Sequence, residues 1–164
     1  MAASVSAQLL EDQTIEGVEA ALQAVTGVLS LGRVQDRILR EARVDISRAD
    51  SALLYNLYNS GDHVRLRDLA GRLGVDAPTV TRRVQQLEAR RLLRRTADLV
   101  DKRALRVQLT SDGTRAIEKV LKARRTWLER VLRSWTAEDR VQLERVMGLF
   151  AAAITADLES PHGH

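Results

Sequence analysis

The 164-residue chain carries 26 lysines and arginines against 22 acidic residues, a formal net charge of +4, and it contains no cysteine. The length suits one domain or one compact protomer, and the lack of cysteine excludes disulfides, thiolate metal sites and cysteine-based oxidant sensing. No uncharged apolar run of about 18 residues and no basic segment followed by an apolar core occurs, so we predict neither a membrane span nor a secretory signal and expect a cytoplasmic protein.

The first part of the chain is predicted to be an arm followed by a long helical region. Residues 1–12 are mostly small and polar without periodicity, so we expect a flexible arm. From Ile15 to Gly32, apolar positions step by three or four residues, the spacing of a helix that packs along a partner helix, and the run is predicted to continue to about Glu41. The segment 13–46 is therefore predicted to form helices stabilised by contact within a helical bundle or across a dimer, and we assign it to dimerisation.

A second helix is predicted to begin at Ser47. Its hydroxyl can accept a hydrogen bond from an early backbone N–H, and Asp50 is favoured there by the helix dipole. The helix is expected to run to about Asn59, where Asn-Ser-Gly ends it, and residues 63–65 are expected to add a short strand to a later hairpin. The predicted inward face consists of Leu53, Leu54, Leu57 and Tyr58.

The stretch from Leu66 to Arg91 has the pattern of a helix-turn-helix unit. Ala70 is small where the two helices have to approach closely, and Gly74 falls in the turn, where a positive φ is often needed. The predicted inward positions are Leu69, Leu73, Val75 and Val80.

The second helix of that unit, Asp76 to Arg91, is predicted to contact DNA. Ala77, Val80, Val84 and Leu87 form an apolar stripe at helical spacing. The opposite face and its flanks offer guanidinium, amide and hydroxyl groups, which can hydrogen bond to base edges and phosphates in a major groove. We predict that the contacting residues are Thr79, Thr81, Arg82, Arg83, Gln85 and Gln86.

A hairpin is predicted to follow. Leu105, Val107 and Leu109 alternate with polar residues, as in a half-buried strand, and residues 92–96 can pair with them, leaving 97–103 as the tip. Alternation sends Arg94 and Arg95 to opposite faces, so we predict that only Arg94 contacts phosphate. At the tip, Asp101 can hold the guanidinium of Arg103, beside Lys102, while the arginine reaches a narrow minor groove.

Basic charge is concentrated in this central part. Residues 61–110 contain twelve lysines and arginines against six acidic residues, a surplus larger than that of the whole chain. A localised surplus favours a phosphate backbone as partner, because it orients the encounter as well as strengthening it.

Two further helices are expected in the segment 111–159, which we assign to dimerisation, followed by a flexible tail over 160–164. The first is capped by residues 110–113, and the second restarts at Thr136, with acidic residues in its first turn. Their apolar faces contain Ile117, Leu121, Leu128, Val131 and Trp135 in the first, and Leu143, Met147, Phe150, Ile154 and Leu158 in the second.

Several fragments of the chain together resemble the MarR family of bacterial regulators. They are Leu69-Ala70, Val80-Thr81-Arg82, Leu87-Glu88, Leu92-Leu93-Arg94-Arg95, Asp101-Lys102-Arg103 and Leu109-Thr110 with Gly113. The resemblance implies a mainly α protein with a small β-hairpin wing, in which a winged helix-turn-helix domain at 47–110 is flanked by N- and C-terminal helices that form an interlocked homodimer. It also implies a crevice for a small phenolic or lipophilic ligand. The residues expected there are Tyr55, Tyr58, Arg33 and Arg37.

The sequence therefore predicts a homodimeric, sequence-specific transcriptional regulator. We expect a repressor whose pseudo-palindromic operator has half-sites roughly 34–36 Å apart. A non-specific architectural DNA-binding protein without an effector is the alternative, and a helical scaffold is a third class. We predict no enzymatic activity and no cofactor, since no phosphate loop or nucleophile motif occurs, and no metal site, since the three histidines lack partners at ligand spacing.

Overall fold

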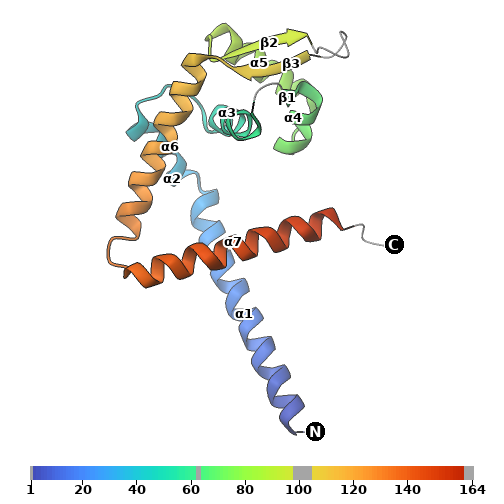
Figure 1. The fold of residues 1–164 in the computed structure, drawn as a ribbon, viewed down its shortest axis with the longest axis vertical. Helices are drawn as coiled ribbons and strands as arrows, with labels where there is room; N and C mark the ends of the chain where they lie inside the picture. Colours follow the sequence, from blue (N-terminus) through green and yellow to red (C-terminus); the bar gives the residue numbers. More distant parts are fainter. Residues whose placement is uncertain (1, 62–63, 98–104, 161–164) are drawn as a thin grey trace. The chain divides into compact units, whose positions relative to one another are not determined.

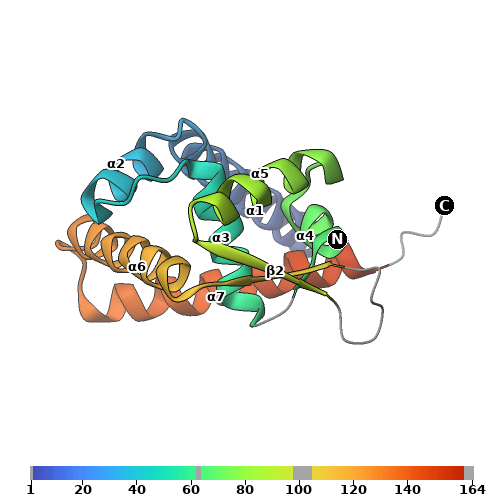
Figure 2. The ribbon, with the colours of Figure 1, turned by 90° about the horizontal axis from the view of Figure 1, so that it is seen from above.

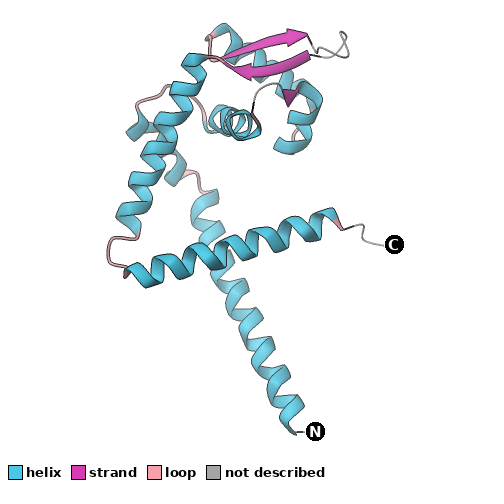
Figure 3. Cartoon of the chain, in the orientation of Figure 1, coloured by secondary structure: helices cyan, strands magenta, loops and turns pink. Residues whose placement is uncertain are grey.

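The computed structural model describes residues 2–61, 64–97 and 105–160. Within them it is mainly helical with one small sheet, as the sequence predicts (Figures 1 and 3). The elements in chain order are α1 (Ala2–Ser30), α2 (Arg33–Ala42), α3 (Arg48–Ser60), β1 (Val64–Arg65), α4 (Leu66–Leu73), α5 (Ala77–Ala89), β2 (Leu93–Ala97), β3 (Leu105–Leu109), α6 (Ser111–Val131) and α7 (Ala137–Glu159). The chain divides into two compact units, Met1–Arg124 and Arg125–His164, which we describe separately.

The N-terminal region differs from the prediction in two ways. Helix α1 already begins at Ala2, whereas a flexible arm was expected there; alanine, glutamine, leucine and glutamate in this stretch all favour helix without any apolar periodicity. The helix predicted to continue to about Glu41 is instead interrupted after Ser30. Gly32 adopts φ 67°, a left-handed conformation that ends one helix and precedes the next.

Helix α3 lies at the centre of the first unit. It begins with the predicted cap at Ser47, where the hydroxyl accepts from the N–H of Asp50 and the Asp50 carboxylate accepts from the N–H of Ser47. Leu53, Leu54 and Leu57 are buried as predicted. Tyr58 was predicted to face inward but is exposed.

The sheet has the strand order β1-β3-β2, with both pairs antiparallel. Residues 64 and 65 pair with β3, which confirms the predicted third strand for that part. Burial along β3, the central strand, does not follow simple alternation: Val107 and Gln108 are both buried, whereas Leu105, predicted to face inward, is exposed. Figure 2 shows α5 beside β2, which it contacts, while α3 contacts β3.

In the second unit, α7 starts with the predicted capping box. The Thr136 hydroxyl accepts from the N–H of Asp139, whose carboxylate accepts from the Thr136 N–H and hydroxyl. The hydrogen bond that the Thr136 hydroxyl donates to the carboxylate has the larger effect and the one from the Thr136 N–H the smaller, and together they hold the pKa of Asp139 below its ordinary value. None of the residues of α7 is buried, so its predicted apolar face is accessible.

Candidate nucleic-acid interface

The helix-turn-helix is formed by α4 and α5. Leu69 and Ala70 are buried, and Gly74 has φ 63° and ends α4 in the left-handed conformation that the sequence predicts. Val75 was predicted to be inward, but it lies in the turn and is exposed. Asp76 caps α5, which ends at Ala89, within two residues of the predicted boundary.

Helix α5 has two clearly different faces. Val80, Val84 and Leu87 are each only 1% exposed and pack inward. On the opposite side Arg82, Gln85 and Gln86 are exposed, and within the described part of the chain their side chains make no hydrogen bond or salt bridge. Their donors and acceptors are therefore available to an external partner.

The two threonines near the start of α5 are less available. The N–H of Thr79 and then its hydroxyl donate to Asp76, which holds the pKa of that carboxyl below its ordinary value. The hydroxyl of Thr81 donates to the carbonyl of Ala77 at 2.8 Å. Each hydroxyl oxygen keeps lone pairs that can accept a hydrogen bond, but each hydroxyl proton is already used within the helix.

The base of the wing is tied to the recognition helix. The Arg95 guanidinium binds Glu88, with Nε 2.7 Å from Oε2, and this hydrogen bond from the Arg95 side chain lowers the pKa of Glu88. Arg94, on the other face of β2, is exposed as predicted. The predicted tip residues Asp101, Lys102 and Arg103 lie outside the described residues.

Two ion pairs that the sequence does not predict link Arg83 of α5 to the first turn of α3, and Arg90, the C-cap of α5, to the segment before α3. Arg83, predicted to contact DNA, has its Nη1 3.1 Å from Oδ1 of Asp50. Arg90 binds the backbone carbonyl of Asp45 and lies 3.3 Å from its carboxylate. The partners are 33 and 45 positions apart, so no local pattern in the sequence could have indicated them.

A tight backbone joint connects the recognition helix, the wing and α6. The Leu92 carbonyl accepts from the N–H of Thr110 at 3.1 Å, and the Thr110 hydroxyl donates to the carbonyl of Arg91 at 2.6 Å. The same hydroxyl oxygen accepts from the N–H of Gly113 and so caps α6. One hydrogen bond between main-chain groups and two made by the Thr110 hydroxyl therefore fix the end of the recognition helix and the wing to the start of α6.

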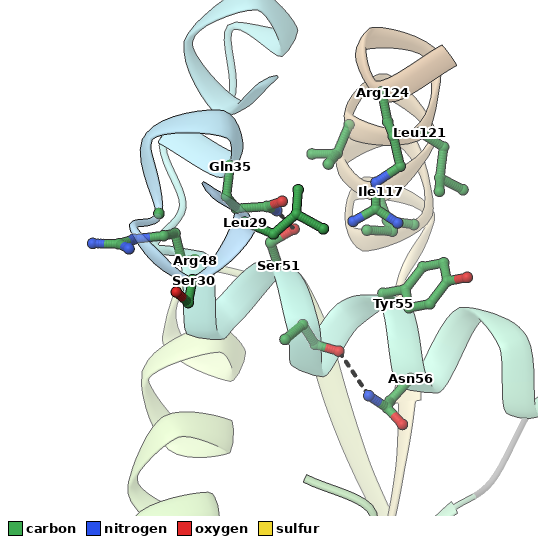
Figure 4. Close-up of a pocket in the computed structure, with 13 residues that line it drawn as sticks. Leu29, Ser30, Gln35, Arg48, Ser51, Tyr55, Asn56, Ile117, Leu121 and Arg124 are labelled. Carbon is green, nitrogen blue, oxygen red and sulfur yellow. Dashed lines mark hydrogen bonds between the residues drawn. The ribbon is translucent and has the colours of Figure 1, made fainter. Parts of the chain in front are cut away.

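A cavity of about 370 Å³ lies on the side of α3 that faces α2 and α6 (Figure 4). Of the predicted ligand residues, Tyr55 lines it, whereas Tyr58, Arg33 and Arg37 do not. Its cationic groups come instead from Arg48 and Arg124. Other lining residues include Ser51, Asn56, Ile117 and Leu121.

The polar groups of this cavity are held in place. The guanidinium of Arg124 lies over the Tyr55 ring, 5.4 Å from its centroid, and Arg48 is paired with Asp36 at 3.2 Å. Ser51 is buried, and Gln35 donates to its hydroxyl oxygen at 3.4 Å. The cavity thus combines apolar walls with two arginines and a tyrosine, which suits a small molecule with an apolar body and an anionic or hydroxyl group.

Two other features are absent from the residues that the structure describes. No group of three or more histidine and acidic side chains there is placed to hold a metal ion. In the same ranges, no helix has the length and apolar character needed to cross a membrane.

This geometry defines a winged helix-turn-helix domain, and known proteins share it. Residues 44–104 match the MarR family model. The HTH-type transcriptional repressor MdtR of Bacillus subtilis (strain 168) is 26% identical over 147 residues, which cover 89% of this chain and 91% of that protein.

Solved structures share the fold. A MarR family protein from Bacillus stearothermophilus superimposes with a TM-score of 0.77 at 24% identity, covering 88% of this chain and 97% of that one. A mutant of S. aureus MepR bound to an oligodeoxyribonucleotide has a TM-score of 0.58 at 20% identity, covering 81% of this chain and 97% of that one. The chain is thus similar to the MarR family over residues 44–104, and it shares the winged helix-turn-helix fold of MarR family proteins.

Proposed function

We propose that this chain is a MarR-family transcriptional regulator, a homodimeric repressor that binds a pseudo-palindromic operator in the cytoplasm and is released by a small-molecule effector. The exposed face of α5 carries the proposal, since Arg82, Gln85 and Gln86 present polar groups that form no hydrogen bond or salt bridge within the described residues, on a capped helix whose other face is buried. Side chains of these types form bidentate contacts with base edges in the major groove. In this scheme Arg94, Lys102 and Arg103 contact the DNA backbone and the minor groove, and Asp101 supports Arg103.

The proposed dimer is supported by an apolar stripe on α1. Ile15, Val18, Leu22, Val25 and Leu29 are 42–67% exposed in the single chain. Full burial of a fully exposed side chain of this size contributes about 1.5–3 kcal/mol, so covering these partly exposed ones contributes roughly half of that each. Such continuous apolar faces normally mark an interface. On α7, Met147, Ile154 and Leu158 are exposed in the same way.

Sedimentation of two charge variants tests the dimer. Leu22→Glu places a carboxylate on the stripe, whereas Gln23→Glu adds the same charge about 100° away around the helix. We expect the first variant to sediment as a monomer at concentrations where the second and the wild type remain dimers. Equal behaviour of both variants would contradict an interface at this stripe.

Operator binding is tested by selecting an enriched duplex from random-sequence DNA and measuring its affinity by gel shift. Arg82→Ala should weaken binding and alter base preference, and Arg103→Ala should weaken it. Arg40→Ala, which removes an exposed arginine of α2, is the control for lost charge alone. Competition with random DNA separates a regulator, which keeps a large specificity ratio at physiological salt, from an architectural protein, which does not.

The proposed effector site is the cavity lined by Tyr55, Arg48 and Arg124. Its lining supports a small phenol or aromatic acid as ligand, with the anionic or hydroxyl group near an arginine. A panel of such compounds should lower operator affinity by about 5–150-fold, the usual scale of coupling between two sites. Arg124→Met should raise the ligand concentration required while leaving ligand-free DNA binding intact. A panel without effect on any operator complex would remove the effector from the proposal.

A further inference from the structure

Asp50 divides its two carboxylate oxygens between two helices. Oδ2 accepts from the N–H of Ser47 at 3.2 Å and so helps to cap α3, while Oδ1 accepts from Nη1 of Arg83 at 3.1 Å. The N–H of Asp50 in turn donates to the Ser47 hydroxyl at 3.1 Å. The cap therefore holds the carboxylate in place on α3, and α5 meets a fixed acceptor.

The Arg83–Asp50 pair is better shielded from solvent than the Arg90–Asp45 pair. The side chains of Arg83 and Asp50 are 30% and 13% exposed, whereas the Asp45 carboxylate that faces Arg90 is fully exposed to solvent. Water and salt screen exposed pairs strongly and shielded pairs much less. Of the two contacts, Arg83–Asp50 is the one that can hold α5 in a defined orientation.

Such a contact makes the orientation of α5 more precise. The helix packs through Val80, Val84 and Leu87, and this apolar packing decides which face points inward but supplies no directional bond. A hydrogen-bonded ion pair at the edge of that stripe is directional, and it resists rotation of α5 about its own axis. Rotation matters because it would turn Arg82 and Gln86 away from the groove that they are proposed to read.

We propose that Arg83 is a positioning residue of the recognition helix: its ion pair with Asp50 fixes the rotation of α5, and Arg83 itself does not contact DNA. The inference rests on the proposed DNA-binding function of α5. It makes Asp50, an acidic residue of α3, necessary for tight operator binding. A direct phosphate contact by Arg83 predicts the opposite sign, because removing Asp50 would then free a cation for the DNA and remove a nearby negative charge.

The test uses Asp50→Asn, Arg83→Gln and the double variant in the full-length protein, with the duplex most enriched by wild-type selection from random DNA as probe. We expect each single variant to weaken binding on the order of tenfold, the double variant to be little worse than either one, and the salt dependence of affinity to be unchanged. Tighter or unchanged binding by Asp50→Asn, or a salt slope reduced by about one in Arg83→Gln, would overturn the inference.

Two controls separate positioning from simple loss of stability. Ser47→Ala removes the hydroxyl half of the cap of α3, but it keeps the backbone N–H of residue 47 that holds Oδ2 of Asp50 and so leaves the Arg83–Asp50 pair. Asp45→Asn removes the exposed carboxylate at Arg90. Both should change operator affinity less than twofold, since neither touches the shielded pair. If Ser47→Ala weakened binding as much as Asp50→Asn, the effect would belong to the stability of α3, and the inference would be wrong.

Hydrogen exchange of the free protein tests the ion pair without DNA. Asp50→Asn and Arg83→Gln should speed amide exchange in α5, whereas Ser47→Ala should speed it in α3. Unchanged exchange in α5 would overturn the inference by itself. If the wild type enriches no DNA sequence although exchange in α5 responds as expected, the proposed function fails while the structural role of Arg83 stands.

Discussion

Replacement of Gly113 by alanine should loosen the joint between the wing and α6. A Cβ at this position would lie 2.0 Å from the carbonyl oxygen of Leu92 and 3.3 Å from Cδ2 of Leu109. Carbon and oxygen atoms normally approach to about 3.3 Å, so the two backbone segments would have to separate by roughly 1 Å. The Leu92 carbonyl also accepts from the N–H of Thr110, and that separation would stretch the bond.

The expected loss is about 1–3 kcal/mol of unfolding free energy from overpacking, with about 1 kcal/mol more if the Thr110 hydrogen bond breaks. Urea denaturation at a fixed protomer concentration measures it, since the stability of a dimer depends on concentration. Gly71→Ala is the matched control. Gly71 lies inside α4 with no atom within 4 Å of an added Cβ, so alanine should stabilise the protein by up to about 1 kcal/mol. A Gly113→Ala protein as stable as the wild type would refute this reasoning.

Two further changes test single interactions. The hydrogen bond from the Arg95 side chain lowers the pKa of Glu88. The stability that this bond contributes is therefore present above the ordinary glutamate pKa of about 4.3, and it is lost as the pH falls through the lowered pKa of Glu88. The wild type should therefore lose stability more steeply than Glu88→Gln between roughly pH 5 and 3, and parallel pH profiles in urea denaturation would contradict this. Thr136→Ala should cost about 1 kcal/mol by removing the cap of α7, whereas Thr136→Ser should keep most of it; equal losses would show that the cap is not the cause.

The features that the sequence predicted well are those decided by nearby residues. The cap at Ser47, the cap at Thr136 and the left-handed turn at Gly74 each depend on groups within about four positions, and all three are observed. The buried stripe of α5 follows from periodicity alone in the same way. Local chemistry therefore determined the order of the elements and the exposed face of the recognition helix.

The features that the sequence predicted poorly depend on contacts between distant segments. The interruption at Gly32 was not predicted because the apolar spacing continues through it, and only the backbone conformation shows the break. The cavity cations were misassigned because Arg124 reaches Tyr55 from a helix much later in the chain. Arg83 has the spacing of a flank residue on α5, and only the folded position of Asp50 reveals its partner.

The first turns of α3 lie between the cavity and the recognition helix. Arg48 and Ser51 line the cavity, while Asp50, between them in sequence, binds Arg83. Leu53 and Leu54 are fully buried just beyond, so this helix cannot deform freely, and a ligand that displaces its first turns has to displace Asp50 with them. A hydrogen bond at 3.1 Å is already near the long end of the normal range, so a further displacement of about 0.5 Å would break it. In the proposed regulator, we expect an effector in this cavity to release the rotation of α5 in this way, without any change in the contacts between the wing and α6.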